Sequence, residues 1–80
     1  MAFEVIYSRA AEKYLDKQQQ TTQKRIIDAI DKLPEGDVIK LQGRQGYRLT
    51  IGGFRVLFDY IDGNTVDVLV IGPRGDVYKK

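Results

Sequence analysis

Apolar residues alternate on both sides of a glycine pair in the middle of the chain. The segment YRLTIGGFRVLFDY, residues 47–60, is rich in β-branched and aromatic residues, and Gly52-Gly53 can take the positive φ angles that a two-residue turn requires. The pattern predicts a β-hairpin in which Ile51 faces Phe54. Side-chain alternation then gives the hairpin one apolar and one mixed face. The apolar face holds Tyr47, Leu49, Ile51, Phe54, Val56, Phe58 and Tyr60, and the mixed face holds Arg48, Thr50, Arg55, Leu57, Asp59 and Ile61.

Helical spacing dominates the first part of the chain, after a short strand. Residues 2–7 alternate and predict the strand, and Ser8 is a good N-cap for a helix over about residues 9–18. A second helix extends to about residue 33, where Pro34 and Gly36 end it. Its core-facing stripe consists of Ile26, Ile27, Ile30 and Leu33.

The remaining elements complete a single sheet. Residues 35–46 are polar and contain three glycines, so they predict a surface loop. After a turn at residues 62–64, the apolar residues 65–71 predict a strand, and the turn length decides whether Val66, Val68 and Val70 or Leu69 and Ile71 face the helices. We therefore expect one α+β domain over residues 1–80. Two N-terminal helices pack on one face of a mainly antiparallel four-stranded sheet in the order strand, helix, helix, strand, strand, strand.

Composition narrows the possible chemistry. The 80 residues contain no cysteine and no histidine, so neither a disulfide nor a thiolate or imidazole metal site is expected. The aspartates lack the spacing of a metal loop, and no glycine motif precedes a helix as in a phosphate-binding loop. We expect a protein without metal or small-molecule cofactor. Because no apolar run approaches the roughly 20 residues of a membrane span, we expect no membrane association and a cytoplasmic location.

Positive charge is concentrated although the net charge is only +2. Residues 38–58 contain four basic residues and no acidic one, and the last residues of the chain are again basic. The positive field is therefore expected over the loop, the hairpin and the C-terminus.

Arginines from separate strands are the strongest candidates for a site. The expected meander brings Arg74, after the last strand, near the start of the strand that carries Arg55. Guanidinium groups bind phosphate bidentately and can stabilise the charge of a phosphorane, and Tyr78 can stack on a base. The candidate catalytic cluster is Arg48, Arg55, Arg74 and Tyr78. The alternative is that these are ordinary exposed strand and tail residues.

The missing histidine constrains any RNA-cleaving mechanism. In-line attack of a 2′-hydroxyl calls for a general base and acid, and histidine is the usual side chain near neutral pH. Tyrosine and arginine are poor proton shuttles at their ordinary pKa values. A nuclease of this composition must therefore depend on positioning and charge stabilisation, or on a partner that bends the RNA into line.

Four short motifs, in this order, resemble the RelE/ParE superfamily of bacterial toxins from type II toxin-antitoxin modules. They are Lys40-Leu41-Gln42-Gly43, Tyr47-Arg48-Leu49, Phe54-Arg55-Val56 and the segment Gly72–Lys79. The resemblance covers essentially the whole chain. For the RelE branch it implies a ribosome-dependent endoribonuclease that cuts messenger RNA and is silenced by a cognate antitoxin.

The resemblance also implies roles for residues. Arg55 and Arg74 stabilise the phosphate charge, Tyr78 stacks on the nucleotide, and Arg48 lies where active members carry a basic residue. The candidate RNA-binding positions are Lys40, Arg44, Thr50, Lys79 and Lys80.

Two departures keep alternatives open. Thr50 lies where some RelE proteins have a lysine, and Pro73 replaces a histidine that often precedes the C-terminal arginine. The ParE branch has the same scaffold and inhibits DNA gyrase without cutting RNA. A non-catalytic gyrase inhibitor and an inactive module that binds RNA or an antitoxin are the alternatives.

Overall fold

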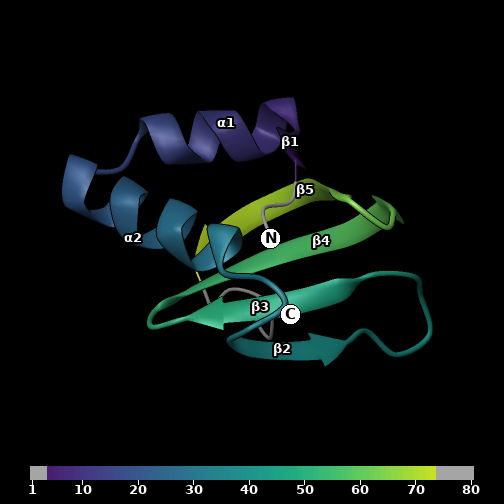
Figure 1. Ribbon diagram of the computed structural model, residues 1–80. Helices are drawn as coiled ribbons and strands as arrows, with labels where there is room; N and C mark the ends of the chain where they lie inside the picture. Colours follow the sequence, from purple (N-terminus) through teal and green to yellow (C-terminus); the bar gives the residue numbers. More distant parts are fainter. Residues whose placement is uncertain (1–3, 74–80) are drawn as a thin grey trace.

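The computed structural model describes residues 4–73, in which two helices lie on one side of a five-stranded sheet (Figure 1). The α+β class and the helical layer confirm the prediction from sequence. In chain order the elements are β1 (Glu4–Tyr7), α1 (Arg9–Asp16), α2 (Gln20–Asp31), β2 (Asp37–Lys40), β3 (Tyr47–Ile51), β4 (Phe54–Asp62) and β5 (Thr65–Pro73). No helix in this part of the chain is both long and apolar enough to span a bilayer.

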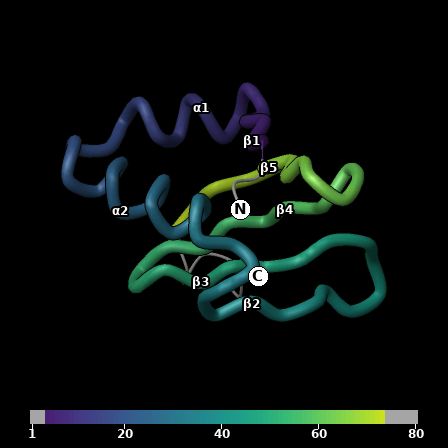
Figure 2. The backbone as a smooth tube through the Cα atoms, viewed as in Figure 1, coloured from purple at the N-terminus to yellow at the C-terminus, as the bar shows by residue number. Residues whose placement is uncertain are grey.

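The sheet has one more strand than the four that the sequence predicts. Its order is β1-β5-β4-β3-β2, with β1 parallel to β5 and all other pairs antiparallel. The extra strand is β2, which lies within the segment expected to be a loop and pairs with β3 along its whole length. The backbone leaves the end of α2 and enters β2 at the sheet edge (Figure 2). Only four residues form β2, too few for a clear periodic signal.

The central hairpin has the predicted register. Ile51 pairs with Phe54 and Thr50 with Arg55, and Gly52 adopts a positive φ of 53° in the turn. Glycine takes such a φ at little steric cost; Gly53 does not adopt a positive φ, so Gly52 alone supplies the conformation that fixes this register. The two faces of the hairpin are consequently those that alternation assigns.

A β-bulge resolves the open question about β5. Leu57 pairs with Val70 while the next residue, Phe58, pairs with Val68, so Leu69 is the extra residue. Val66 and Val68 face the helices before the bulge and Ile71 after it, so neither of the two alternatives holds along the whole strand.

The core lies between the helices and the sheet. Ser8 caps α1, because its Oγ accepts a hydrogen bond from the Ala11 N–H at 3.0 Å, and the same hydroxyl donates to the Leu69 carbonyl at 2.7 Å. The first turn of α1 is thereby tied to the bulge of β5. The buried side chains are Ala11, Leu15, Ile26, Ile30, Leu33, Leu49, Ile51, Val56, Phe58, Val66, Val68 and Ile71.

Candidate functional site

The sheet face that no helix of residues 4–73 covers, here called the open face, collects the charged residues of the hairpin. Helices α1 and α2 lie together on the other side (Figure 1). Because paired residues share a face, the register defines rows of side chains across the open face. One row consists of Asp37, Thr50, Arg55 and Gly72, and the next consists of Ile39, Arg48, Leu57 and Val70.

Arg55 has open space on one side of it. Its partner on β5 is Gly72, which has no side chain, and a Cβ added there would meet no described atom within 4 Å. Its partner on β3 is Thr50, a small side chain with a hydroxyl group. The guanidinium therefore lies between a gap and a hydroxyl, an arrangement that leaves room for an anion.

Arg48 and Arg55 are diagonal neighbours on adjacent antiparallel strands. Such positions are about 7–8 Å apart at the backbone, within reach of two long side chains that contact one group. Both side chains are half-buried, and the Nε atom of each is buried. Within residues 4–73, the Nε of Arg55 has no hydrogen-bond acceptor and the side chain forms no ion pair. A buried donor in this condition is costly for the fold, and an anionic ligand would satisfy it.

The other candidate residues fall into two groups. Lys40 pairs with Tyr47 and so lies on the helix side of the sheet, whereas Arg44 is exposed in the segment between β2 and β3. Neither shares a row with Arg55. Positions 74, 78, 79 and 80 lie outside the described residues, so the predictions for Arg74, Tyr78, Lys79 and Lys80 are not addressed by the structure.

Sequence reasoning missed Asp37 and Ile39, because the prediction of a loop left residues 37–40 without a face. Asp37-Val38-Ile39-Lys40 runs polar, apolar, apolar, polar and so shows no strand periodicity; the local signal is Gly36, whose φ of 117° marks where the chain turns into the strand. Asp37 enters the row of Arg55 only because β2 pairs with β3.

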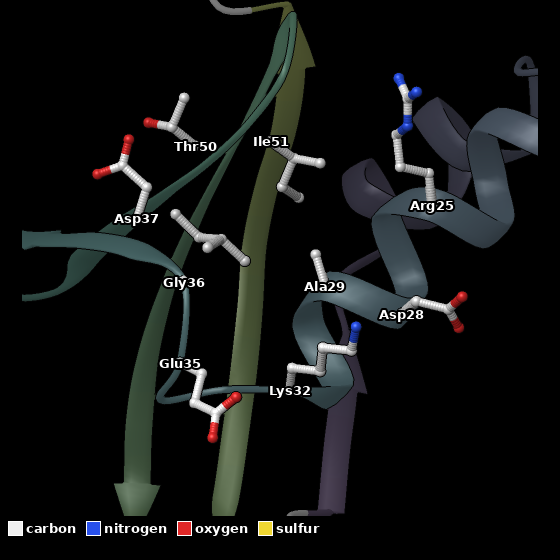
Figure 3. Close-up of a pocket in the computed structure, with 10 residues that line it drawn as sticks. Arg25, Asp28, Ala29, Lys32, Glu35, Gly36, Asp37, Thr50 and Ile51 are labelled. Atoms are coloured by element: carbon white, nitrogen blue, oxygen red, sulfur yellow. The ribbon is translucent and has the colours of Figure 1, made fainter.

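A groove of about 520 Å³ lies between α2 and the edge of the sheet (Figure 3). Leu49, Ile51 and Ala29 supply its apolar lining, and the charged groups around it are Arg25, Asp28, Lys32, Glu35 and Asp37. Asp37 and Thr50 point toward one another at its sheet side (Figure 3). The groove therefore adjoins the Arg55 row at β2.

Two tyrosines have perturbed acidity. Burial and, to a smaller extent, the negative charge of Asp31 raise the pKa of Tyr7. Burial and the neighbouring Tyr47 raise the pKa of Tyr60, whose ring lies 5.5 Å from that of Tyr47. Both phenols are therefore protonated at neutral pH, and register and burial assign both to the helix side of the sheet.

The fold and sequence are similar to those of known toxins. Over residues 5–78 the sequence matches the family model described as the ParE toxin of the type II toxin-antitoxin system. No curated protein sequence matches the chain.

Three solved complexes contain a chain of similar fold. A chain of the archaeal RelE-RelB complex from Pyrococcus horikoshii is 26% identical with a TM-score of 0.74, and the match covers 94% of this chain and 98% of that one. For the RelB-RelE antitoxin-toxin complex from Methanococcus jannaschii the identity is 20%, the TM-score 0.73 and the coverage 91% and 94%. For the RelBE toxin-antitoxin complex from Mycobacterium tuberculosis the identity is 17%, the TM-score is 0.70, and the match covers 92% of this chain and 100% of that one.

The family match spans nearly the whole chain, and the fold agrees with those of the RelE-RelB complexes. The protein therefore belongs to the ParE toxin family of type II toxin-antitoxin systems, within the RelE/ParE superfamily.

Proposed function

We propose that this toxin is a metal-independent endoribonuclease that cuts messenger RNA on the ribosome. The observation that carries the proposal is the buried Nε of Arg55, which has no acceptor among residues 4–73 and lies diagonal to Arg48 on a face without helical cover. An RNA phosphate supplies acceptors of the required charge, and bidentate arginine contacts suit its geometry.

The chemistry expected at this face is in-line attack of a ribose 2′-hydroxyl on the adjacent phosphorus. Arg48 and Arg55 stabilise the negative charge that develops on the phosphoryl oxygens. Arg74 follows Pro73 directly in the sequence, and Pro73 pairs with Phe54, the residue before Arg55. A third guanidinium at the same phosphate is thus part of the proposal, and Tyr78 is assigned to stacking on the nucleotide.

We assign the binding of RNA outside the reacting nucleotide to basic residues beyond the open face. Arg44 in the segment before β3 and Lys40 on β2 are both exposed, so they can contact backbone phosphates beyond the open face. Thr50, beside Arg55, supplies a hydroxyl for hydrogen bonding. Lys79 and Lys80 are assigned to the same task by their charge.

A cognate antitoxin is the proposed partner in the cytoplasm. The two similar archaeal structures are a RelE-RelB complex and a RelB-RelE antitoxin-toxin complex. A nuclease directed at translated messages needs such a neutralising partner if the host is to survive. A small acidic reading frame adjacent to the gene for this toxin is the expected source.

Inhibition of DNA gyrase is the second candidate, and the match to the ParE family model favours it. Such a toxin binds a protein target and catalyses nothing, so it has no use for a guanidinium cluster at one phosphate. Thr50, in place of a second lysine, is compatible with either function.

Induction of the toxin in growing cells separates the two candidates. If the toxin is a nuclease, mapped message ends appear within translated regions only, and plasmid supercoiling stays normal. Arg55→Ala and Arg74→Ala then abolish growth arrest while the circular dichroism spectrum is retained. Intact messages together with a supercoiling defect reject the nuclease and support gyrase inhibition.

A further inference from the structure

A carboxylate lies in the same row as Arg55 on the open face. Asp37 on β2 pairs with Thr50 on β3, which pairs with Arg55 on β4. Two strand spacings separate the backbones of Asp37 and Arg55, about 10 Å. The side chains of Asp37 and Thr50 point toward one another (Figure 3). The row thus offers a carboxylate, a hydroxyl and an arginine on one face of three adjacent strands.

Asp37 has no competing role in the fold. Its side chain is exposed and forms no hydrogen bond or ion pair within residues 4–73. Its backbone pairs with Thr50 whatever side chain it carries. Within residues 4–73, a carboxylate without a side-chain partner thus shares a row with an Arg55 Nε that lacks an acceptor, and it is available to act on a ligand held by that arginine.

Among residues 4–73, no other carboxylate of the open face lies across a single strand from Arg55. Asp59 and Asp67 pair with each other, and Asp59 is four residues beyond Arg55 on β4, about 13 Å along the strand. Asp59 is also engaged locally, because its Oδ1 accepts a hydrogen bond from the Tyr60 N–H at 2.9 Å. Asp37 is therefore the acid of this face, among the described residues, that lies across a single strand from Arg55.

We infer that Asp37 is the general base of the cleavage reaction, an assignment that rests on the proposed ribonuclease function. The carboxylate takes the proton of the 2′-hydroxyl, a bond forms between O2′ and phosphorus, and the bond between phosphorus and O5′ breaks. The departing O5′ takes a proton from water, and the hydroxide that remains removes the proton from Asp37, so the products are a 2′,3′-cyclic phosphate and a 5′-hydroxyl end and the carboxylate is restored. No metal ion, oxidant or further reactant is required.

The composition of the chain leaves few other groups for this task. The sequence has no histidine, and arginine stays protonated above pH 12. Thr50 cannot accept a proton at neutral pH, and Tyr7 and Tyr60, with raised pKa values, lie on the helix side. A carboxylate is a weak but competent base when the ribosome holds the RNA in line.

The test is single-turnover cleavage of a message in programmed ribosomes by purified toxin. Because a general base contributes about 10²–10⁴ to rate, Asp37→Asn is expected to cut at least about 100-fold more slowly than the wild type, and Asp37→Glu to retain most of the rate. Asp59→Asn removes a carboxylate from the same face and serves as the matched control with wild-type rate. Circular dichroism and urea midpoints check that each variant folds.

Chemical rescue distinguishes a base from a positioning residue. Asp37→Gly leaves a gap, so added formate is expected to restore part of the cleavage, whereas chloride at equal ionic strength does not. Cleavage by Asp37→Asn at the wild-type rate overturns the assignment of the base and leaves the nuclease function standing. Slow cleavage by Asp37→Gly that formate does not restore has the same meaning. No cleavage by the wild type on ribosomes rejects the nuclease function and this inference with it.

Discussion

Replacing Arg55 with methionine is expected to change stability and activity in opposite directions. Methionine keeps an unbranched apolar stem of similar length on the open face and removes the guanidinium. The Nε of Arg55 is buried without an acceptor among residues 4–73, and a buried donor in this condition costs about 1–3 kcal/mol. Because the rest of the half-buried side chain reaches solvent, we take the lower end, a gain of about 1 kcal/mol in the free energy of unfolding.

The corresponding rise in the thermal midpoint is about 4–8 °C, since 1 kcal/mol has that effect in a domain of 60–100 residues. Activity is expected to fall by about 10²–10³, the usual cost of removing one donor to a transition-state anion. Thermal unfolding followed by circular dichroism gives the first value, and message cleavage in programmed ribosomes gives the second.

Arg25→Met is the matched control, because Arg25 is an exposed arginine on α2, away from the open face. Substitutions at such sites change stability by less than about 0.5 kcal/mol, so neither the midpoint nor cleavage is expected to change measurably. A lower midpoint for Arg55→Met, together with lost activity, would show that Arg55 serves the fold. A raised midpoint with full cleavage would remove the guanidinium from the reacting phosphate.

Four further substitutions test the fold and the site. Phe58→Ala empties a fully buried position on β4 and should lower the free energy of unfolding by about 3–5 kcal/mol in urea titrations. Gly46→Ala introduces a Cβ at a φ of 117° and 3.2 Å from the Phe58 carbonyl oxygen, so it should cost about 1–3 kcal/mol, whereas Gly53→Ala, with no atom within 4 Å, should be near neutral. Burial raises the pKa of Tyr7 above its ordinary value of 10.0 in the folded state only. The contribution of this tyrosine to stability is therefore complete below pH 10 and is lost as the pH rises through the folded pKa. Tyr7→Phe should accordingly flatten the fall of the thermal midpoint in alkaline buffers. Gly72→Val fills the space beside Arg55 with a strand-compatible side chain and should lower message cleavage by crowding the guanidinium while the thermal midpoint is kept or raised, and unimpaired cleavage would show that Arg55 does not need this space.

The parts of the fold that follow from local chemistry were predictable. The Gly52-Gly53 pair specifies the two-residue turn, and this turn fixes the pairing of Thr50 with Arg55 and hence both faces of the hairpin. Ser8 likewise specifies the start of α1, because its hydroxyl satisfies an amide that would otherwise lack a partner.

The parts that depend on distant contacts were not predictable. β2 is a strand because β3 offers it a free edge to pair with, and four residues are too few to show the periodicity of a strand. The bulge at Leu69 is another case: the Ser8 hydroxyl, 61 residues earlier, hydrogen-bonds to its carbonyl. Pairing rather than sequence pattern therefore placed Asp37 beside the predicted cluster and defined which β5 residues face the helices.

Several residues of the open face are unfavourable for the stability of the sheet. The residues that break the rules of a stable sheet surface gather in neighbouring rows: a half-buried guanidinium without an acceptor at Arg55, a glycine inside a strand at Gly72, and an exposed isoleucine at Ile39. Each departure lowers stability relative to an ordinary strand residue. Deviations of this kind persist where function requires them. Because one anion at the Arg55 row would supply the acceptor that the buried Nε lacks, a phosphate ligand accounts for the first of these departures with a single interaction.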